Sequence, residues 1–127
     1  YQKLGIDFGI VNSIDGYDEI SPTGDFKVTT NNYERIFKPS DLGFTIIKPE
    51  ELRAGANEQE AKEIFDAVLA NTALPAQKNV VHANAAFAIQ VLEKGKKDIE
   101  ECIDIARESI DSGKALDTFK KFVELNS

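Results

Sequence analysis

Adjacent acidic side chains are the residues of this sequence with the clearest chemical potential, because paired carboxylates can hold a divalent cation. Three such pairs occur, Asp18–Glu19, Glu50–Glu51 and Glu100–Glu101. The second and third pairs fall in the first turns of predicted helices, where carboxylates interact favourably with the positive end of the helix dipole. That structural role accounts for both of them, and it leaves Asp18–Glu19 as the pair to explain.

Asp18–Glu19 follows Gly16 and Tyr17 at a junction between a strand and a turn. Consecutive side chains of a regular strand point to opposite faces, so both carboxylates can reach one ion only if the backbone turns there, which Gly16 allows. Two hard oxygen donors on a loop suit Mg²⁺, which takes one or two protein carboxylates and fills its remaining positions with waters and substrate phosphates. The spacing alone leaves two interpretations open, a magnesium site and a solvated acidic turn.

The other candidate residues favour structural roles. No second histidine or nearby cysteine completes a zinc set or a nucleophile–base pair, so we expect His82 to be a hydrogen-bonded structural residue. Cys102 lies on an apolar helical stripe and is expected in the core. Asn84 lies between alanines and needs a partner if buried, so we expect it to bond to the backbone of a neighbouring loop. With no serine beside a base and no phosphate-binding glycine pattern, we predict no catalytic and no cofactor-binding residue apart from the metal pair.

Two kinds of element position these residues, and together they predict an α+β fold. Apolar and β-branched runs predict a strand over 8–13, an extended piece at 20–21 and a hairpin over 26–37. Short helical turns are expected within 40–52. Apolar residues at three-and-four spacing then predict a helical cluster over 57–125, and the spacing and punctuation divide it into four helices. Their predicted ranges are 57–71, 75–94, 98–112 and 114–125.

Two of these helices carry specific expectations for packing. The helix that begins at Pro75 is apolar on nearly every side, so we expect it to be buried on nearly every side as the central element. In the last helix we expect the apolar side chains Leu116, Phe119, Phe122 and Val123 to point inward.

Composition limits the class of protein. The 127 residues include 22 acidic and 15 basic side chains, a net charge of −7, which argues against a nucleic-acid partner. The length fits one domain over residues 1–127. One cysteine excludes a disulfide framework, and no apolar run approaches the ~20 residues that cross a bilayer, so we expect no membrane partner and a cytoplasmic location. Methionine is absent, so we expect the chain to be part of a longer one.

Four segments resemble, in the same order, motifs of the anthranilate phosphoribosyltransferase family. Gly16–Gly24 is similar to its G-x-D-E-I-S-x-T-G segment, and Asp41–Gly43 is similar to its D-L-G. Asn84–Ala86 resembles its N-A-A helix, and Ser112–Leu116 resembles its S-G-K-A-L. The similarity extends from about residue 8 to residue 123. Asp25, where a proline is common, and Arg53–Ala56, where a double glycine is common, depart from the family pattern.

The resemblance implies an enzyme of tryptophan biosynthesis, built around a larger α/β domain of the phosphoribosyltransferase and nucleoside-phosphorylase type. In this family the amine of anthranilate attacks C1 of phosphoribosyl pyrophosphate and expels diphosphate. The adjacent Asp-Glu pair binds a Mg²⁺ associated with that diphosphate, so the resemblance assigns the metal to Asp18 and Glu19.

The family's glycine-rich phosphoribosyl pyrophosphate loop, its lysine-histidine-glycine segment and its anthranilate-binding arginine are not found in this sequence. We therefore expect a carboxy-terminal fragment that is inactive alone. The family forms homodimers mainly through an amino-terminal helical domain, so we expect this chain to be a monomer. Three alternatives stay open: a related pyrimidine-nucleoside phosphorylase, a non-catalytic nucleic-acid-binding relative and a helical interaction module without a ligand.

Overall fold

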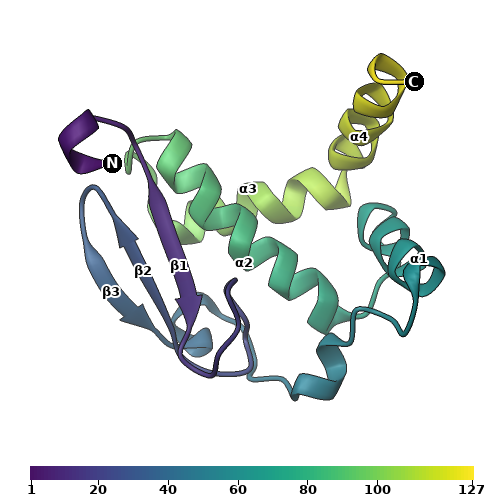
Figure 1. The fold of residues 1–127 in the computed structure, drawn as a ribbon, viewed down its shortest axis with the longest axis horizontal. Coiled ribbons are helices and arrows are strands. Elements are labelled where there is room, and N and C mark those ends of the chain that lie inside the picture. The colour runs from purple at the N-terminus through teal and green to yellow at the C-terminus, as the bar shows by residue number, and fades with distance from the viewer.

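The computed structural model describes residues 1–127 as an α+β fold, in which a small sheet lies on one side of a long central helix and further helices lie on the other (Figure 1). The strands are β1 (Gly9–Ser13), β2 (Phe26–Thr30) and β3 (Glu34–Phe37). The helices are α1 (Glu58–Leu69), α2 (Pro75–Leu92), α3 (Ile99–Asp111) and α4 (Lys114–Leu125). Single 3₁₀ turns occur at η1 (Gln2–Leu4), η2 (Pro39–Leu42) and η3 (Pro49–Leu52).

Most of the predicted elements are confirmed. The hairpin, the first strand and all four helices lie within a few residues of their expected bounds. The extended piece expected at 20–21 is wrong, because these residues belong to the loop that joins β1 to β2. No helix combines the length and the apolar character that crossing a membrane requires.

The sheet is antiparallel throughout, with β2 between β1 and β3. Val28 in β2 lies opposite Val11 in β1 and opposite Arg35 in β3. Phe26 and Val28 are fully buried while Lys27 between them is half-buried, because side chains alternate between the two faces of a strand. One face of the sheet therefore supplies the core.

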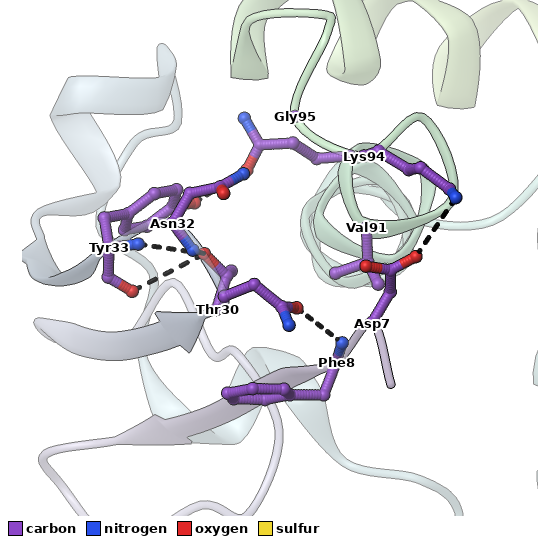
Figure 2. Close-up of a pocket in the computed structure, with 10 residues that line it drawn as sticks. Asp7, Phe8, Thr30, Asn32, Tyr33, Val91, Lys94 and Gly95 are labelled. Carbon is purple, nitrogen blue, oxygen red and sulfur yellow. Dashed lines mark hydrogen bonds and ion pairs between the residues drawn. The ribbon is translucent and has the colours of Figure 1, made fainter. Parts of the chain in front are cut away.

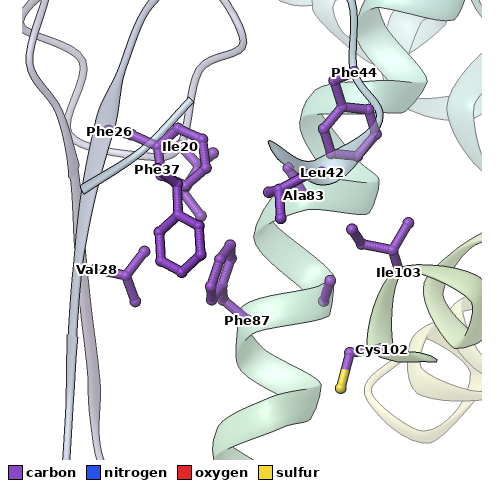
Figure 3. Close-up of a cluster of buried hydrophobic side chains, with 11 residues drawn as sticks. Ile20, Phe26, Val28, Phe37, Leu42, Phe44, Ala83, Phe87, Cys102 and Ile103 are labelled. Atoms are coloured by element: carbon purple, nitrogen blue, oxygen red, sulfur yellow. The ribbon is translucent and has the colours of Figure 1, made fainter. Parts of the chain in front are cut away.

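Aromatic rings join this face of the sheet to α2 (Figure 3). Phe26 and Phe37 stack with their ring centroids 5.8 Å apart. Phe87 of α2 meets Phe37 edge-on at 5.3 Å and Phe26 at 6.0 Å. On the other side of α2, Cys102 and Ile103 of α3 complete one cluster of eleven buried residues. Cys102 is fully buried, as predicted.

α2 is the central element, as predicted, but one of its sides is not covered. Ala83, Ala86 and Phe87 are buried, whereas Ala88 is exposed and Leu92 is 80% exposed. The prediction that α2 is buried on nearly every side is therefore wrong. An apolar surface indicates that burial of a helix would be favourable, but it does not indicate which other segment packs against it.

α4 also leaves apolar side chains exposed, contrary to the prediction that they point inward. The helix projects from the end of α3, away from the sheet (Figure 1), and none of its residues is buried. Leu116 and Phe119 are half-buried, and Phe119 meets Phe65 of α1 edge-on with centroids 5.0 Å apart. Phe122 is 62% exposed and Val123 is 43% exposed, so the prediction that both point inward is wrong.

His82 lies among the buried residues of α2, yet neither of its ring nitrogens has a hydrogen-bond partner. The prediction of a hydrogen-bonded histidine is therefore wrong. Burial lowers the pKa of His82, and the positive charges of Arg107 on α3 and Lys78 on α2 lower it further, against an opposing effect of Asp111. The ring is neutral at neutral pH, because a buried imidazolium would have no compensating hydrogen bond.

This histidine should make stability depend on pH in a window where little else titrates. As pH falls below about 6.5, the unfolded chain binds a proton on His82 before the folded chain does, so the free energy of unfolding should decrease. The decrease should not exceed about 1.4 kcal/mol per pH unit and should level off once pH passes the lowered folded pKa. Urea unfolding between pH 7.5 and 5 measures this slope. His82→Leu should remove it, since the chain has no other histidine. Equal slopes in the two proteins would show that His82 is not the group responsible.

Candidate functional site

The loop that joins β1 to β2 carries the Asp18–Glu19 pair. It turns at Gly16, whose φ of +105° lies in the left-handed region that favours glycine. The Gly16 N–H donates to the Ser13 carbonyl at 3.3 Å, and the Ser13 N–H donates to the Tyr17 carbonyl at 2.9 Å. The glycine bend predicted before the acidic pair is confirmed.

A buried serine hydroxyl holds the segment that follows the pair. Ser13, only 3% exposed, donates from Oγ to the Glu19 carbonyl at 2.9 Å. The same oxygen accepts the Ser21 N–H at 2.8 Å. Ser13 therefore fixes the backbone on both sides of Ile20.

Asn84 of α2 fixes Ile20 itself. Its Oδ1 accepts the Ile20 N–H at 3.0 Å, and its Nδ2 donates to the Ile20 carbonyl at 2.8 Å. Nδ2 also donates to the carbonyl of Val80 on its own helix at 2.9 Å. The prediction that Asn84 bonds to the backbone of a neighbouring loop is confirmed. Because Ile20 is fully buried, its two backbone groups would have no water to replace this amide.

Hydroxyl groups shape the returning half of the loop. Ser21 Oγ and Thr23 Oγ1 lie 2.7 Å apart, and the Thr23 hydroxyl donates to the Asp15 carboxylate. Asp15 thus closes the loop, and its carboxylate already has the Thr23 hydroxyl as a hydrogen-bond partner. The Ile47 N–H donates to the Pro22 carbonyl at 3.2 Å, which ties the loop to the segment before η3.

Asp18 and Glu19 differ from the other acidic pairs in having no structural task. Both are exposed, and neither carboxylate forms a hydrogen bond or an ion pair within the chain. By contrast, Glu51 accepts the Lys48 N–H at 2.8 Å and Glu101 accepts the Asp98 N–H at 3.1 Å, both at the starts of helical segments. The structural role predicted for those two pairs is confirmed through Glu51 and Glu101.

The arrangement limits what kind of metal site the pair can form. No group of three or more His, Cys, Asp or Glu side chains is placed to hold an ion. A cage made entirely of protein ligands is therefore absent, whereas Mg²⁺ needs only one or two protein carboxylates when phosphates and waters supply the rest. The residue types fit Mg²⁺, and the binding itself stays a prediction.

A pocket that the sequence did not predict opens beside Glu19. Its volume is about 370 Å³, and it lies between the loop, η3, α1 and α2. Its lining is mostly apolar, with Tyr17, Glu19, Ser21, Arg53 and Gln77 as polar members, and Asp18 is not among the lining residues. Of the acidic pair, only Glu19 lines this pocket. Spacing could not reveal it, because its walls come from four separate segments.

Gly55 follows Arg53 and Ala54, which line this pocket. Its φ is +92°, and a Cβ atom added there would lie 2.7 Å from Cβ of Glu60 and 2.8 Å from the backbone nitrogen of Ala61. Only glycine avoids both the strain and the overlap. The Arg53–Ala56 segment, which departs from the family's double glycine, therefore keeps a glycine at a position where the backbone requires one.

A second, polar pocket lies beside the amino end of β1 (Figure 2). The loop that carries Asp18–Glu19 follows the other end of this strand. Its volume is about 300 Å³. Its two charged groups pair with each other, with Lys94 Nζ 3.7 Å from the Asp7 carboxylate. Thr30 Oγ1 accepts the N–H groups of Asn32 and Tyr33 at 3.1 and 3.2 Å. These polar groups satisfy one another, so the acidic loop remains the candidate site.

Comparison with known proteins then decides the family. Residues 2–116 match the profile of the glycosyl transferase family, a/b domain. The chain belongs to this family. The anthranilate phosphoribosyltransferase of Phocaeicola vulgatus is 60% identical over 127 residues, and that of Bacteroides fragilis (strain YCH46) is 55% identical over 126 residues. The chain spans 38% of the length of each of these relatives. The resemblance seen in the sequence motifs is confirmed.

Solved structures share the fold. Anthranilate phosphoribosyltransferase from Thermus thermophilus superposes with a TM-score of 0.83 at 22% identity, over 97% of this chain and 36% of that one. The enzyme from Saccharomyces cerevisiae gives a TM-score of 0.82 at 24% identity, over 95% of this chain and 36% of that one. The arrangement of sheet, loop and helices is therefore the one found in this family.

The side-chain amide of Asn84 should account for much of the order of the loop between β1 and β2. Asn84→Ala leaves the N–H and the carbonyl of Ile20 buried without partners, so we expect the free energy of unfolding to fall by about 2–4 kcal/mol. We also expect faster hydrogen exchange at the Ile20 amide. Asn126→Ala is a matched control, because Asn126 bonds only to a carbonyl of its own helix at an exposed end and should cost less than about 0.5 kcal/mol. Urea unfolding compares the two, and equal costs would contradict the role given to Asn84.

Proposed function

We propose that this chain supplies the magnesium-binding loop of an enzyme that transfers the phosphoribosyl group of phosphoribosyl pyrophosphate to the amine of anthranilate. The proposal is supported by the names of the relatives that are 60% and 55% identical to the chain. The observation that carries it is an exposed, unpaired Asp18–Glu19 whose following backbone is held by hydrogen bonds to Ser13 and Asn84. The chain spans 38% of the length of those relatives, so we assign it the metal-binding loop and not a whole active site.

Asp18 and Glu19 would hold the Mg²⁺. When bound, the ion neutralises charge on the diphosphate as it leaves, which removes the need for a proton donor at the leaving group. The donor types fit, since both side chains offer hard oxygens and neither is used elsewhere in the chain. An enzyme of this fold from Saccharomyces cerevisiae has been solved in complex with PRPP and Mg.

Electrostatics also support a cation at this loop. The chain has a net charge of −7, and two adjacent carboxylates repel a diphosphate that approaches them directly. A divalent cation held by Asp18 and Glu19 would offset this repulsion. An anionic substrate is therefore compatible with this loop only together with a cation.

The order of the loop contributes by positioning. Ser13 fixes the backbone on either side of Ile20 and Asn84 fixes Ile20 itself, directly after Glu19, so the carboxylates need not be ordered when the substrate binds. Preorganised charge costs no reorganisation at the moment of reaction. In that reaction the anthranilate amine forms a bond to C1, the C1–oxygen bond breaks with its electron pair leaving on diphosphate, and the amine loses one proton.

The chain's only histidine takes no part in that proton transfer. Both ring nitrogens of His82 are buried, so a substrate at the exposed loop cannot reach them. The proposal therefore assigns this chain metal binding and positioning, with no general base. It also keeps the expectation that the chain alone is inactive and monomeric.

Magnesium should perturb one loop only. In ¹H–¹⁵N spectra of the chain titrated with MgCl₂, we expect shifts confined to residues 16–24, with weak affinity because substrate phosphates are absent. Asp18→Asn together with Glu19→Gln should abolish these shifts. Glu50→Gln together with Glu51→Gln provides the control, since it removes the same charge from another exposed pair and should leave the shifts at 16–24 unchanged. Shifts that persist in the first double variant, or that are equally large at all three acidic pairs, would overturn the proposal.

A further inference from the structure

The pocket beside Glu19 has walls that all come from this chain. Its lining residues lie between positions 17 and 81, in the loop after β1, in η3 and the two residues after it, in α1 and in α2. Its volume of about 370 Å³ is at the small end of the range of ~300–1,000 Å³ that ligand sites occupy. An apolar lining with a few polar groups is also typical of such sites. The size and the lining therefore fit a small organic molecule.

Hydrogen bonds order three of the four walls before any ligand binds. The side-chain amide of Asn84 holds the loop after β1. At the start of η3, the Lys48 N–H donates to the Glu51 carboxylate at 2.8 Å. At the start of α1, the Ala56 N–H donates to the Glu60 carboxylate at 2.8 Å. The fourth wall is the regular helix α2. A pocket with ordered walls loses little conformational entropy when a ligand enters it.

Apolar side chains of the lining remain open to solvent. Phe65 of α1 is 47% exposed and Val81 of α2 is 38% exposed, and both line the pocket. Ile64 and Leu69 of α1 are half-buried members of the same lining. A ligand with an apolar body removes this surface from water, which favours its binding. The rings of Tyr17 and Phe65 favour an aromatic ligand in particular, because aromatic rings attract one another in offset or edge-on contact.

Two side chains of opposite charge line the same pocket. The Glu19 carboxylate and the Arg53 guanidinium are both exposed, and neither forms an ion pair within the chain. A guanidinium binds a carboxylate through two parallel hydrogen bonds, and a carboxylate binds an ammonium group. Gln77 uses its amide oxygen to accept the Leu74 N–H at 3.1 Å, which leaves its amide nitrogen for a ligand carboxylate. A ligand with one charge satisfies one of the two charged groups, whereas a zwitterion satisfies both.

We propose that this pocket binds a free α-amino acid with an aromatic side chain, whose ring lies against the apolar lining, whose carboxylate pairs with Arg53 and whose ammonium group pairs with Glu19. The family motifs do not account for such a site, because Arg53 belongs to the Arg53–Ala56 segment that departs from the family pattern.

One consequence of this binding rests on the proposed function. An ammonium group held by Glu19 competes with Mg²⁺ for the same carboxylate. The amino acid and the ion should therefore weaken each other's binding, and by the same factor, because coupling between two ligands is reciprocal. The amino acid would in this way regulate the metal-binding loop.

Three ligands that differ by one group each test the recognition. L-phenylalanine carries the ring and both charges, phenylpropionate lacks the ammonium group, and phenethylamine lacks the carboxylate. In ¹H–¹⁵N spectra of the 127-residue chain, we expect L-phenylalanine to shift the amides of Tyr17, Leu52, Ile64 and Val81, one from each wall, with a Kd on the order of 1 mM. Each analogue should bind at least about tenfold more weakly, because it loses one charge-assisted contact.

Variants should remove these preferences one at a time. In Arg53→Gln, L-phenylalanine should bind no more tightly than phenethylamine, and in Glu19→Gln it should bind no more tightly than phenylpropionate. Ala61→Phe places a larger side chain at the pocket lining, so it should weaken the binding of all three ligands. Lys121→Gln is the control, because it removes a charge from an exposed position outside the pocket and should change none of the affinities.

Three results would overturn the proposed amino-acid site. The first is a spectrum in which L-phenylalanine leaves the wall amides unshifted at about twenty times the expected Kd. The second is equal affinity for L-phenylalanine and both analogues in the unmodified chain, which would show that the ring alone binds. The third is an affinity for L-phenylalanine that Arg53→Gln does not change.

A magnesium titration in the presence of L-phenylalanine separates this site from the proposed function. The amino acid should raise the Mg²⁺ concentration that gives half of the full shift at residues 16–24, and an unchanged concentration would overturn the competition for Glu19. Wall amides that respond to L-phenylalanine, in a chain whose residues 16–24 do not respond to Mg²⁺, would support the amino-acid site and count against the proposed function.

Discussion

The bond between the Asn84 amide and both backbone groups of Ile20 is the interaction on which the site depends. It joins positions 64 residues apart, and it connects the central helix to a loop with no regular secondary structure. An amide side chain is suited to this task because it offers a donor and an acceptor in one plane, which match the N–H and carbonyl of a single residue. The loop is thereby held by side-chain bonds in place of a strand ladder.

The hydrophobic core and this polar bond support each other. Ile20 belongs to the same buried cluster as Phe26 and Phe87, so burial of its side chain brings its backbone against α2. That burial would be costly without Asn84 and Ser13, because buried peptide groups need partners. In return, the loop can expose Asp18 and Glu19 to solvent while the residue after them is fully enclosed. An acidic pair on a fixed backbone is what distinguishes this loop from an ordinary solvated turn.

Local sequence patterns predicted the elements well because their causes are local. The prolines and the three-and-four apolar spacing each act within a few residues, and the helices they predict are present. In the structure, the Asn57 and Asp98 side chains cap the starts of α1 and α3. Asn84 was also predictable, since a polar residue between alanines on an apolar helix must find a partner. The pairing of Asp18–Glu19 with a metal stays a prediction, because it involves a ligand as well as the chain.

The predictions that were wrong or missing share one physical cause, because each depends on the tertiary surroundings of a residue and not on its neighbours in the sequence. His82 was expected to have a hydrogen bond, but nothing in its own helix indicates that α3 offers it none. Phe122 and Leu92 were expected to be buried, but both are exposed. An apolar helix face indicates that burial would be favourable, and it does not indicate which segment would bury it. The pocket beside Glu19 has walls from four segments and no local signal at all.

Hydrogen bonds from Ser13 and Asn84 to the loop backbone should hold an exposed acidic pair rigid before any ligand arrives. Backbone ¹⁵N relaxation measures this rigidity residue by residue. We expect order parameters near 0.85 for Asp18, Glu19 and Ile20, equal to those of the helices even though two of the three residues are exposed. Order parameters below about 0.6 at Asp18 and Glu19 would contradict it, because the pair would then be a mobile turn with no built-in geometry for a cation.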